Sequence, residues 1–153
     1  MGQITIDRTK PFEPIFVCKW FTIEKDETDV RSMALSEIDL TKVRFVAMLK
    51  EGETSITGEE RLKRLKAAGY IRLDAKFFQT LWENKQFIPE SWKQKVNGNM
   101  CSIHFDGTVL RDLRGHRCVQ GICLRNNEWD WDCRWLDGNW NAHDLSAVLE
   151  ISS

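Results

Sequence analysis

The sequence lacks the features that mark a membrane-spanning, exported or nucleic-acid-coating protein. It has no apolar run of roughly 20 residues and no cationic segment leading into an apolar one, so we expect neither a spanning helix nor export. Its 22 basic residues balance 23 acidic ones, which leaves no overall field to attract nucleic acid or anionic lipid. The five cysteines have no compact framework spacing, which indicates free thiols. The sequence therefore predicts a cytoplasmic protein without membrane association.

The chain has 153 residues, the length of one domain with a core of its own. We expect an N-terminal arm (1–14), a segment of strands with a possible helix (15–57), a helical segment (58–95) and a tryptophan-rich β segment (100–149). Within the second segment, residues 15–23 are rich in β-branched and aromatic side chains and predict a strand.

Residues 40–50 fit two patterns. Leu40, Val43 and Ala47 recur at helical spacing, whereas Val43, Phe45 and Ala47 also alternate as in a strand. We favour a helix here and keep the strand as the alternative.

The tryptophan-rich segment predicts the centre of an antiparallel sheet. Its apolar positions alternate with charged ones and are Trp129, Trp131, Cys133 and Trp135. Successive side chains of a strand point to opposite faces, so these four share one face. A two-residue turn at Asn126-Asn127 would place Leu124 opposite Trp129 on that same face. The agreement between turn chemistry and alternation fixes the register of this hairpin.

Three further turns extend the predicted sheet into a meander of four to five strands. Asp137-Gly138 would pair Trp140 with Trp135, and Asp106-Gly107 would form a separate hairpin. Around Gly115 an odd-length loop is needed to keep the apolar positions on one face.

Two helices are expected in the middle segment. Thr57 with a glutamate three residues on has the capping-box spacing, and Gly69 suits a left-handed C-cap, which predicts a helix over 58–68. Asp74 caps a second helix that reaches about Lys85. Its apolar face is formed by Phe77, Phe78, Leu81 and Trp82. We therefore predict an α+β fold in which helices cover one face of the meander.

Several stretches resemble a group of short bacterial proteins known mainly as predicted sequences. They are Gly58 to Leu62, Leu73 to Lys76, Leu81 to Asn84, Ile88 to Trp92, Phe105 to Leu110 and Ser146 to Leu149. The resemblance spans most of the chain. It implies a bacterial source and an unassigned function, and it transfers no site residues.

The tryptophan face has two interpretations. It could be a platform for sugars, bases or a proline-rich peptide, but an antiparallel sheet normally buries one face, and the aromatic helix can cover this one. Trp140, next to the turn, is the ring that we expect to be partly exposed and available for binding.

Two pairs of residues have the composition of an acid–base site. Asp132 paired with His143 could form a base and its orienting carboxylate, as in a hydrolase, although no nucleophile accompanies them. Asp130 and Asp132 have the spacing of a glycosidase pair but point away from the tryptophan rings. A salt-bridged polar face explains both pairs better.

Zinc binding is disfavoured because Cys101 and His104, three residues apart on one strand, point to opposite faces. We predict neither a metal nor a cofactor.

Three basic residues of the first helix, Arg61, Lys63 and Arg64, could contact phosphates. The chain is not basic overall, and the helix that follows carries few side chains that read bases, so nucleic-acid binding is the second interpretation. The favoured interpretation is a non-catalytic binding module, with another protein as its partner, and a hydrolase is the third.

Overall fold

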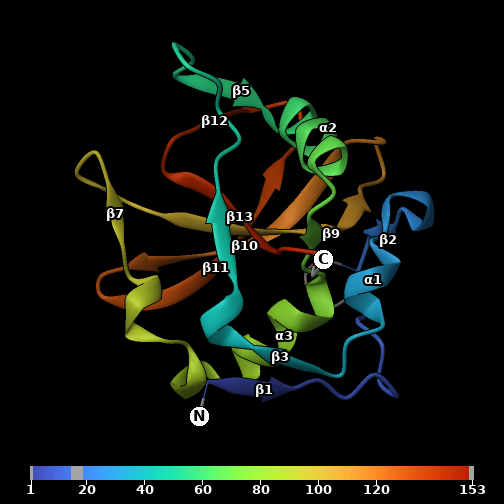
Figure 1. Cartoon of the computed structure of the whole chain (residues 1–153). Coiled ribbons are helices and arrows are strands. Elements are labelled where there is room, and N and C mark those ends of the chain that lie inside the picture. Colours follow the sequence, from blue (N-terminus) through green and yellow to red (C-terminus); the bar gives the residue numbers. More distant parts are fainter. Residues whose placement is uncertain (1, 15–18, 152–153) are drawn as a thin grey trace.

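The computed structural model describes residues 2–14 and 19–151 (Figure 1). Its helices are Val30–Met33 (α1), Gly58–Ala68 (α2) and Ala75–Glu83 (α3), and its 3₁₀ turns are Lys25–Glu27 (η2), Leu40–Lys42 (η3), Lys85–Phe87 (η4) and Glu90–Trp92 (η5). Its strands are Gln3–Thr5 (β1), Thr22–Ile23 (β2), Glu37–Asp39 (β3), Arg44–Val46 (β4), Ser55–Thr57 (β5), Ile71–Arg72 (β6), Lys95–Val96 (β7), Asn99–Met100 (β8), Ser102–Arg111 (β9), Arg117–Arg125 (β10), Glu128–Trp135 (β11), Asn139–Asn141 (β12) and Asp144–Leu149 (β13). The predicted strand over 15–23 lies partly outside the described residues, and its last two residues form β2.

The main sheet has the strand order β11-β10-β9-β13-β4, with β2 paired to β9 and β6 paired to β13. Three two-stranded ribbons, β1-β3, β5-β12 and β7-β8, lie beside it. The predicted α+β class is confirmed. The meander of four to five strands is not, because β13 crosses over and pairs in parallel with β9, which leaves only β9, β10 and β11 as consecutive antiparallel neighbours.

The β10-β11 hairpin has the predicted register. Leu124 lies opposite Trp129 and Cys118 lies opposite Trp135. Asn126 and Asn127 have φ angles of 52° and 64°, the left-handed conformation that a tight two-residue turn requires. Side-chain alternation and turn chemistry were sufficient to place this hairpin.

The predicted hairpin at Asp106-Gly107 is wrong, because both residues lie inside the continuous strand β9. Phe105 pairs with Gln120 and Leu110 with Cys118, so residues 106–109 bulge between these two pairs. Gly107 uses its backbone to donate to the Leu73 carbonyl and to accept from the Asp29 N–H. The opposition of Leu110 and Cys118 confirms the odd-length loop that precedes β10.

The Asp137-Gly138 turn does not return the chain along β11. Instead β12 pairs with β5, and Trp140 lies opposite Ile56 rather than opposite Trp135. The carbonyls of Leu136 and Gly138 accept hydrogen bonds from the first N–H groups of α2. The first N–H groups of a helix have no acceptor within the helix, and the carbonyls of this turn act as their acceptors.

The two predicted helices are confirmed with their caps. The Thr57 side chain accepts from the Glu60 N–H, and Gly69 ends α2 with a φ of 79°. The Asp74 carboxylate caps α3. The helix favoured over 40–50 is wrong: after the turn η3 the chain forms β4, with Phe45 opposite Ala147, because β13 presents a backbone edge that a strand can pair with. Among the described residues, no helix is both long and apolar enough to cross a membrane.

The main sheet is covered on both faces. On one face the main core cluster contains Phe77, Phe78 and Leu81 of α3, and Trp129 and Trp131 pack against it, as the sequence predicts. On the other face Trp140 joins a second cluster with Leu62 of α2. Trp140 is fully buried, which corrects the expectation that it is partly exposed. Figure 1 shows α2 and α3 far apart, on opposite sides of the sheet.

Candidate ligand-binding cavity

The basic residues of α2 do not form a phosphate-binding surface. The Arg61 side chain is fully buried, and its guanidinium donates to the Asp144 carbonyl oxygen. The Arg64 guanidinium is bound by the carboxylates of Glu53 and Glu60. Of the three predicted residues, only Lys63 is exposed and without an ion pair in the part of the chain that the structure describes. The prediction that Arg61 contacts phosphates is therefore wrong, because its side chain is buried.

The predicted pairing of Asp132 with His143 is not formed, because β12 lies beside β5 and not beside β11. Asp132 is opposite Gly121, with Arg125 at 3.7 Å from its carboxylate. The backbone carbonyl of His143 accepts a hydrogen bond from the Ser102 N–H. The structure therefore does not assemble the acid–base pair that the hydrolase interpretation requires.

The polar face of the sheet is buried around His104. Its ring stacks on Trp140 with a centroid separation of 4.6 Å. Burial, together with the charge of Arg134, lowers the pKa of His104 to about 3, so the ring is neutral at pH 7. Burial also raises the pKa of Asp106. These groups are enclosed beneath α2, where a solute cannot reach them directly.

Metal binding has no supporting geometry in residues 2–14 and 19–151. No group of three or more histidine, cysteine, aspartate or glutamate side chains in those ranges could hold an ion.

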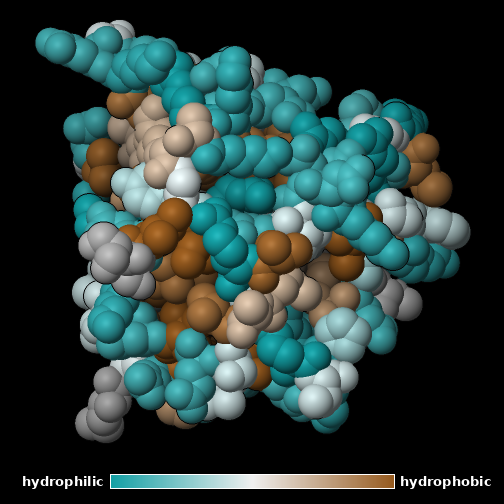
Figure 2. Space-filling model, turned by 45° about the vertical axis from the view of Figure 1, so that its right-hand side comes forward, coloured by the Kyte–Doolittle hydropathy of each residue, from teal (hydrophilic) through white to brown (hydrophobic). Residues whose placement is uncertain are grey.

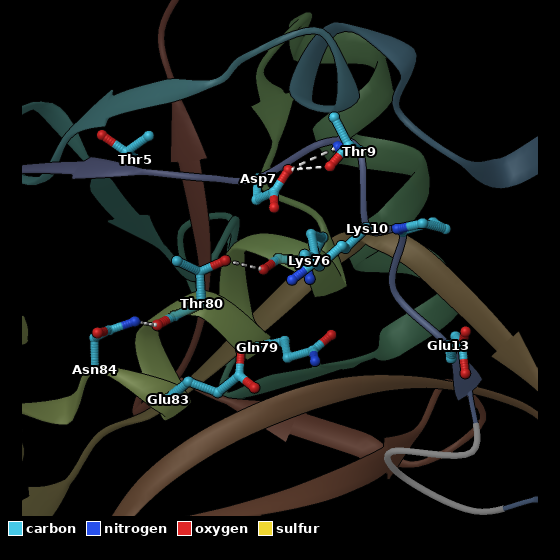
Figure 3. A pocket seen from close by; sticks show the side chains of 11 residues that line it. Thr5, Asp7, Thr9, Lys10, Glu13, Lys76, Gln79, Thr80, Glu83 and Asn84 are labelled. Carbon is cyan, nitrogen blue, oxygen red and sulfur yellow. Dashed lines mark hydrogen bonds between the residues drawn. The ribbon is translucent and has the colours of Figure 1, made fainter.

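An open cavity of about 750 Å³ lies where the N-terminal arm crosses α3 (Figure 3). Apart from one proline its walls are polar or charged. They are formed by Thr5, Asp7, Thr9, Lys10, Pro11, Glu13, Lys76, Gln79, Thr80, Glu83 and Asn84. A concave surface with convergent polar groups is the usual form of a small-molecule site.

The arm is held in place by Arg8. Its guanidinium makes two hydrogen bonds to the Asp74 carboxylate, at 2.8 and 3.0 Å, and further bonds to the carbonyls of Ser32 and Leu35. Burial opposes ionisation of Asp74, but the bonds from Arg8 and Ser32 outweigh it and hold the pKa of Asp74 below its ordinary value. Asp74 also caps α3, so one carboxylate fixes both walls of the cavity.

On the arm side, Asp7 accepts two hydrogen bonds from Thr9, one from its backbone N–H and one from its hydroxyl. The bonds from Thr9, with the positive charges of Lys10 and Lys76, lower the pKa of Asp7. Asp7 is therefore ionised at neutral pH, and both lysines lie close enough to act on it.

On the helix side, a polar stripe at helical spacing faces the cavity. The Thr80 hydroxyl donates to the Lys76 carbonyl, and the Asn84 side chain donates to the Thr80 carbonyl, as Figure 3 shows. Lys76 is only 7% exposed. Within the described ranges its ammonium has no hydrogen bond and no ion pair, and the Gln79 side-chain oxygen is also buried without a partner.

A second, apolar groove of about 370 Å³ lies on the other side of the arm. It is bounded by Phe12, Ile23, Val30 and Met33, and Val30 is 72% exposed. Figure 2, turned toward α1 and β2, shows hydrophobic side chains gathered across this face with hydrophilic ones around them.

Comparison with known proteins adds no further evidence. No family model, curated protein or solved structure matches the chain. The resemblance to short bacterial proteins stays a prediction, and the function has to be argued from the cavity itself.

The cavity residues are not among those that the sequence predicts as binding residues. One signal was present: Lys76, Gln79, Thr80 and Glu83 follow one another at helical spacing on a helix whose other face is aromatic. Such a stripe normally faces solvent, and the sequence does not reveal that the arm lies across it.

Proposed function

We propose that the protein is a non-catalytic binding module that holds a small polar ligand between the N-terminal arm and α3. The observation that carries this proposal is Lys76 in the wall of an open cavity: its side chain is largely buried, and within the described ranges its ammonium makes no hydrogen bond and no ion pair. The three N–H donors of this ammonium are free to bind an anionic group of a ligand.

The architecture around the cavity supports binding without large rearrangement. The arm is tied to α3 through Arg8 and Asp74, and the helix is capped at its start by the same carboxylate. Walls fixed in this way are preorganised, so little conformational entropy is lost when a ligand binds.

Filling the cavity tests the proposal. Thr5 is an exposed strand residue in the cavity wall, and Thr22 is an exposed strand residue outside it. Wild type, Thr5→Trp and Thr22→Trp are incubated with a filtered small-molecule extract of bacterial cells and compared by native mass spectrometry. Wild type and Thr22→Trp should carry the same small-molecule adduct, and Thr5→Trp should lose it. Equal adducts on all three proteins, or none on any, would contradict the proposal.

A second candidate function is docking of another protein, and the apolar groove beside α1 is the observation that favours it. Val30→Arg should then release a partner captured by the wild-type protein. Leu113→Arg, at an exposed apolar residue outside the groove, should retain that partner.

We also propose a cytoplasmic location, supported by the free thiols of Cys101, Cys118 and Cys123. Fractionation of the native cell tests it, and recovery with the membrane or secreted fraction would contradict it.

A further inference from the structure

The cavity separates its charges by depth. Lys76 is the buried cation of the wall, whereas Asp7, Glu13 and Glu83 are exposed carboxylates and Lys10 is an exposed cation. An anionic group of a ligand would be drawn to the Lys76 ammonium, which has no ion pair within the described residues. The three carboxylates would repel a compact polyanion and favour a ligand that also carries a positive charge.

Internal hydrogen bonds already occupy several groups of the wall. The hydroxyls of Thr9 and Thr80 and the amide of Asn84 all donate within the protein. Within the described residues, two groups on α3 keep unused hydrogen-bonding capacity: the Lys76 ammonium makes no hydrogen bond, and the buried Gln79 side-chain oxygen has no donor. A matching ligand therefore needs an acceptor anion and at least one N–H or O–H group.

The helix sets the axial spacing of the two charged residues. Lys76 and Glu83 are seven residues apart on α3, which is about 10 Å at the helical rise of 1.5 Å per residue. A single amino acid is too short to reach both. Three residues of extended peptide span about 10 Å. The helix dipole favours a peptide whose carboxylate lies at the start of α3 and whose amino group lies at its end. A helix attracts anions near its first turn, where Lys76 lies, and cations near its last turn, where Glu83 lies.

We propose that the cavity binds a short peptide of about three residues through its two charged ends. The carboxylate end pairs with the Lys76 ammonium, the Gln79 side chain turns so that its oxygen accepts from a peptide N–H, and the protonated amino end pairs with the Glu83 carboxylate. This inference rests on the proposed function and names the class of ligand.

Calorimetric titration with four probes tests the inference. Triglycine carries both charged ends, N-acetyl-triglycine lacks the amine, triglycine amide lacks the carboxylate, and inorganic phosphate tests a plain anion. Triglycine should bind best. Removing the carboxylate should weaken binding at least tenfold, which is about 1.4 kcal/mol. Removing the amine should weaken it less, because Glu83 is exposed.

Matched variants assign each end of the peptide to its residue. Lys76→Met should lose at least tenfold in affinity for triglycine and nothing for triglycine amide, since that probe has no carboxylate for Lys76 to bind. Glu83→Gln should weaken triglycine and leave N-acetyl-triglycine unchanged. Lys95→Met, at an exposed lysine on β7, should bind like wild type. Lys76→Gln gives a second variant, and thermal melts show whether each variant is folded.

The contradicting outcomes are distinct from those of the proposed function. Triglycine binding that Thr5→Trp blocks but Lys76→Met and Glu83→Gln leave intact would overturn the peptide assignment and leave the cavity as the site. Tighter binding of phosphate than of triglycine, or no triglycine binding while the extract adduct persists, would have the same effect. Absence of both would overturn the inference and the proposed function together.

Discussion

The ion pair between Arg8 and Asp74 makes the most quantitative prediction, because it fixes the arm that forms one wall of the cavity. Asp74 is fully buried and the Arg8 side chain is 18% exposed. In Arg8→Ala the Asp74 carboxylate keeps its hydrogen bonds from the Ser32 hydroxyl and the backbone N–H of Lys76. Removing one partner of a buried ion pair lowers the free energy of unfolding by about 3–5 kcal/mol. Because the carboxylate keeps these other bonds, we expect a loss of about 3 kcal/mol for Arg8→Ala.

Chemical denaturation of four proteins measures this cost: wild type, Arg8→Ala, Asp74→Asn and the double variant. A loss of about 3 kcal/mol corresponds to a fall in melting temperature of about 6–12 °C for a chain of this size. The coupling energy of the cycle should be about 1.5–3 kcal/mol, the range for hydrogen bonds to charged groups. Additive effects, or a cost of Arg8→Ala below about 0.5 kcal/mol, would refute the reasoning.

The pH dependence of the same pair follows from the pKa of Asp74. Because that pKa is lower in the folded chain than its ordinary value of 3.8, the ion pair stabilises the fold fully above that value. The contribution is lost as the pH falls through the folded pKa. The difference between wild type and Arg8→Ala should therefore be constant near neutral pH and shrink in acid. A difference that persists in strong acid would show that Arg8 acts through packing alone.

Three further perturbations test the fold. Gly107→Ala should lower the free energy of unfolding by about 3 kcal/mol or more, since an added Cβ would lie 2.2 Å from the Arg72 carbonyl oxygen. Gly138→Ala is the milder control, and equal stabilities of the two variants in denaturation would contradict the bulge. The pKa of His104 is about 3 in the folded chain, so as the pH falls from 6.5 to 5 the unfolded chain takes up the proton first and the wild type loses stability. The limiting slope of this loss is about 1.4 kcal/mol per pH unit, and His104→Phe should flatten it. An unchanged pH profile would contradict the burial of His104. Gly69→Ala should cost about 1 kcal/mol by thermal melt because of its left-handed φ, and no loss would contradict the cap.

Local chemistry predicted the elements that depend on neighbouring residues. The β10-β11 hairpin follows from the Asn126-Asn127 turn and the alternation of its tryptophans, and α2 follows from the caps at Thr57 and Gly69. In each case a turn or a cap within a few residues sets the local backbone conformation. Short-range patterns are sufficient for such elements.

Long-range pairing decided the elements that the sequence analysis placed wrongly. Asp137-Gly138 has the composition of a hairpin turn, but its flanking carbonyls accept from the start of α2, nearly 80 residues away in the chain. Gly107 lies inside a strand because Leu73 and Asp29 bind its backbone. Within residues 40–50, Arg44–Val46 form a strand because β13 offers an edge. None of these partners can be read from the residues next to the turn.

The cavity was missed for the same reason. Lys76 looks like an ordinary surface residue of an amphipathic helix until the arm is placed across α3. That placement depends on Arg8 reaching Asp74, 66 positions away. A basic residue in a predicted arm and a helix-capping carboxylate give no sign in the sequence that they pair.

The binding claim is tested most directly by a titration of ¹⁵N-labelled protein with triglycine, followed through backbone amide chemical shifts. The account predicts saturable shifts confined to the arm around Asp7 to Lys10 and to α3 from Lys76 to Glu83. It predicts no change in the β10-β11 hairpin or around Val30. Shifts centred on the groove beside α1, or no saturable shifts at millimolar peptide, would contradict it.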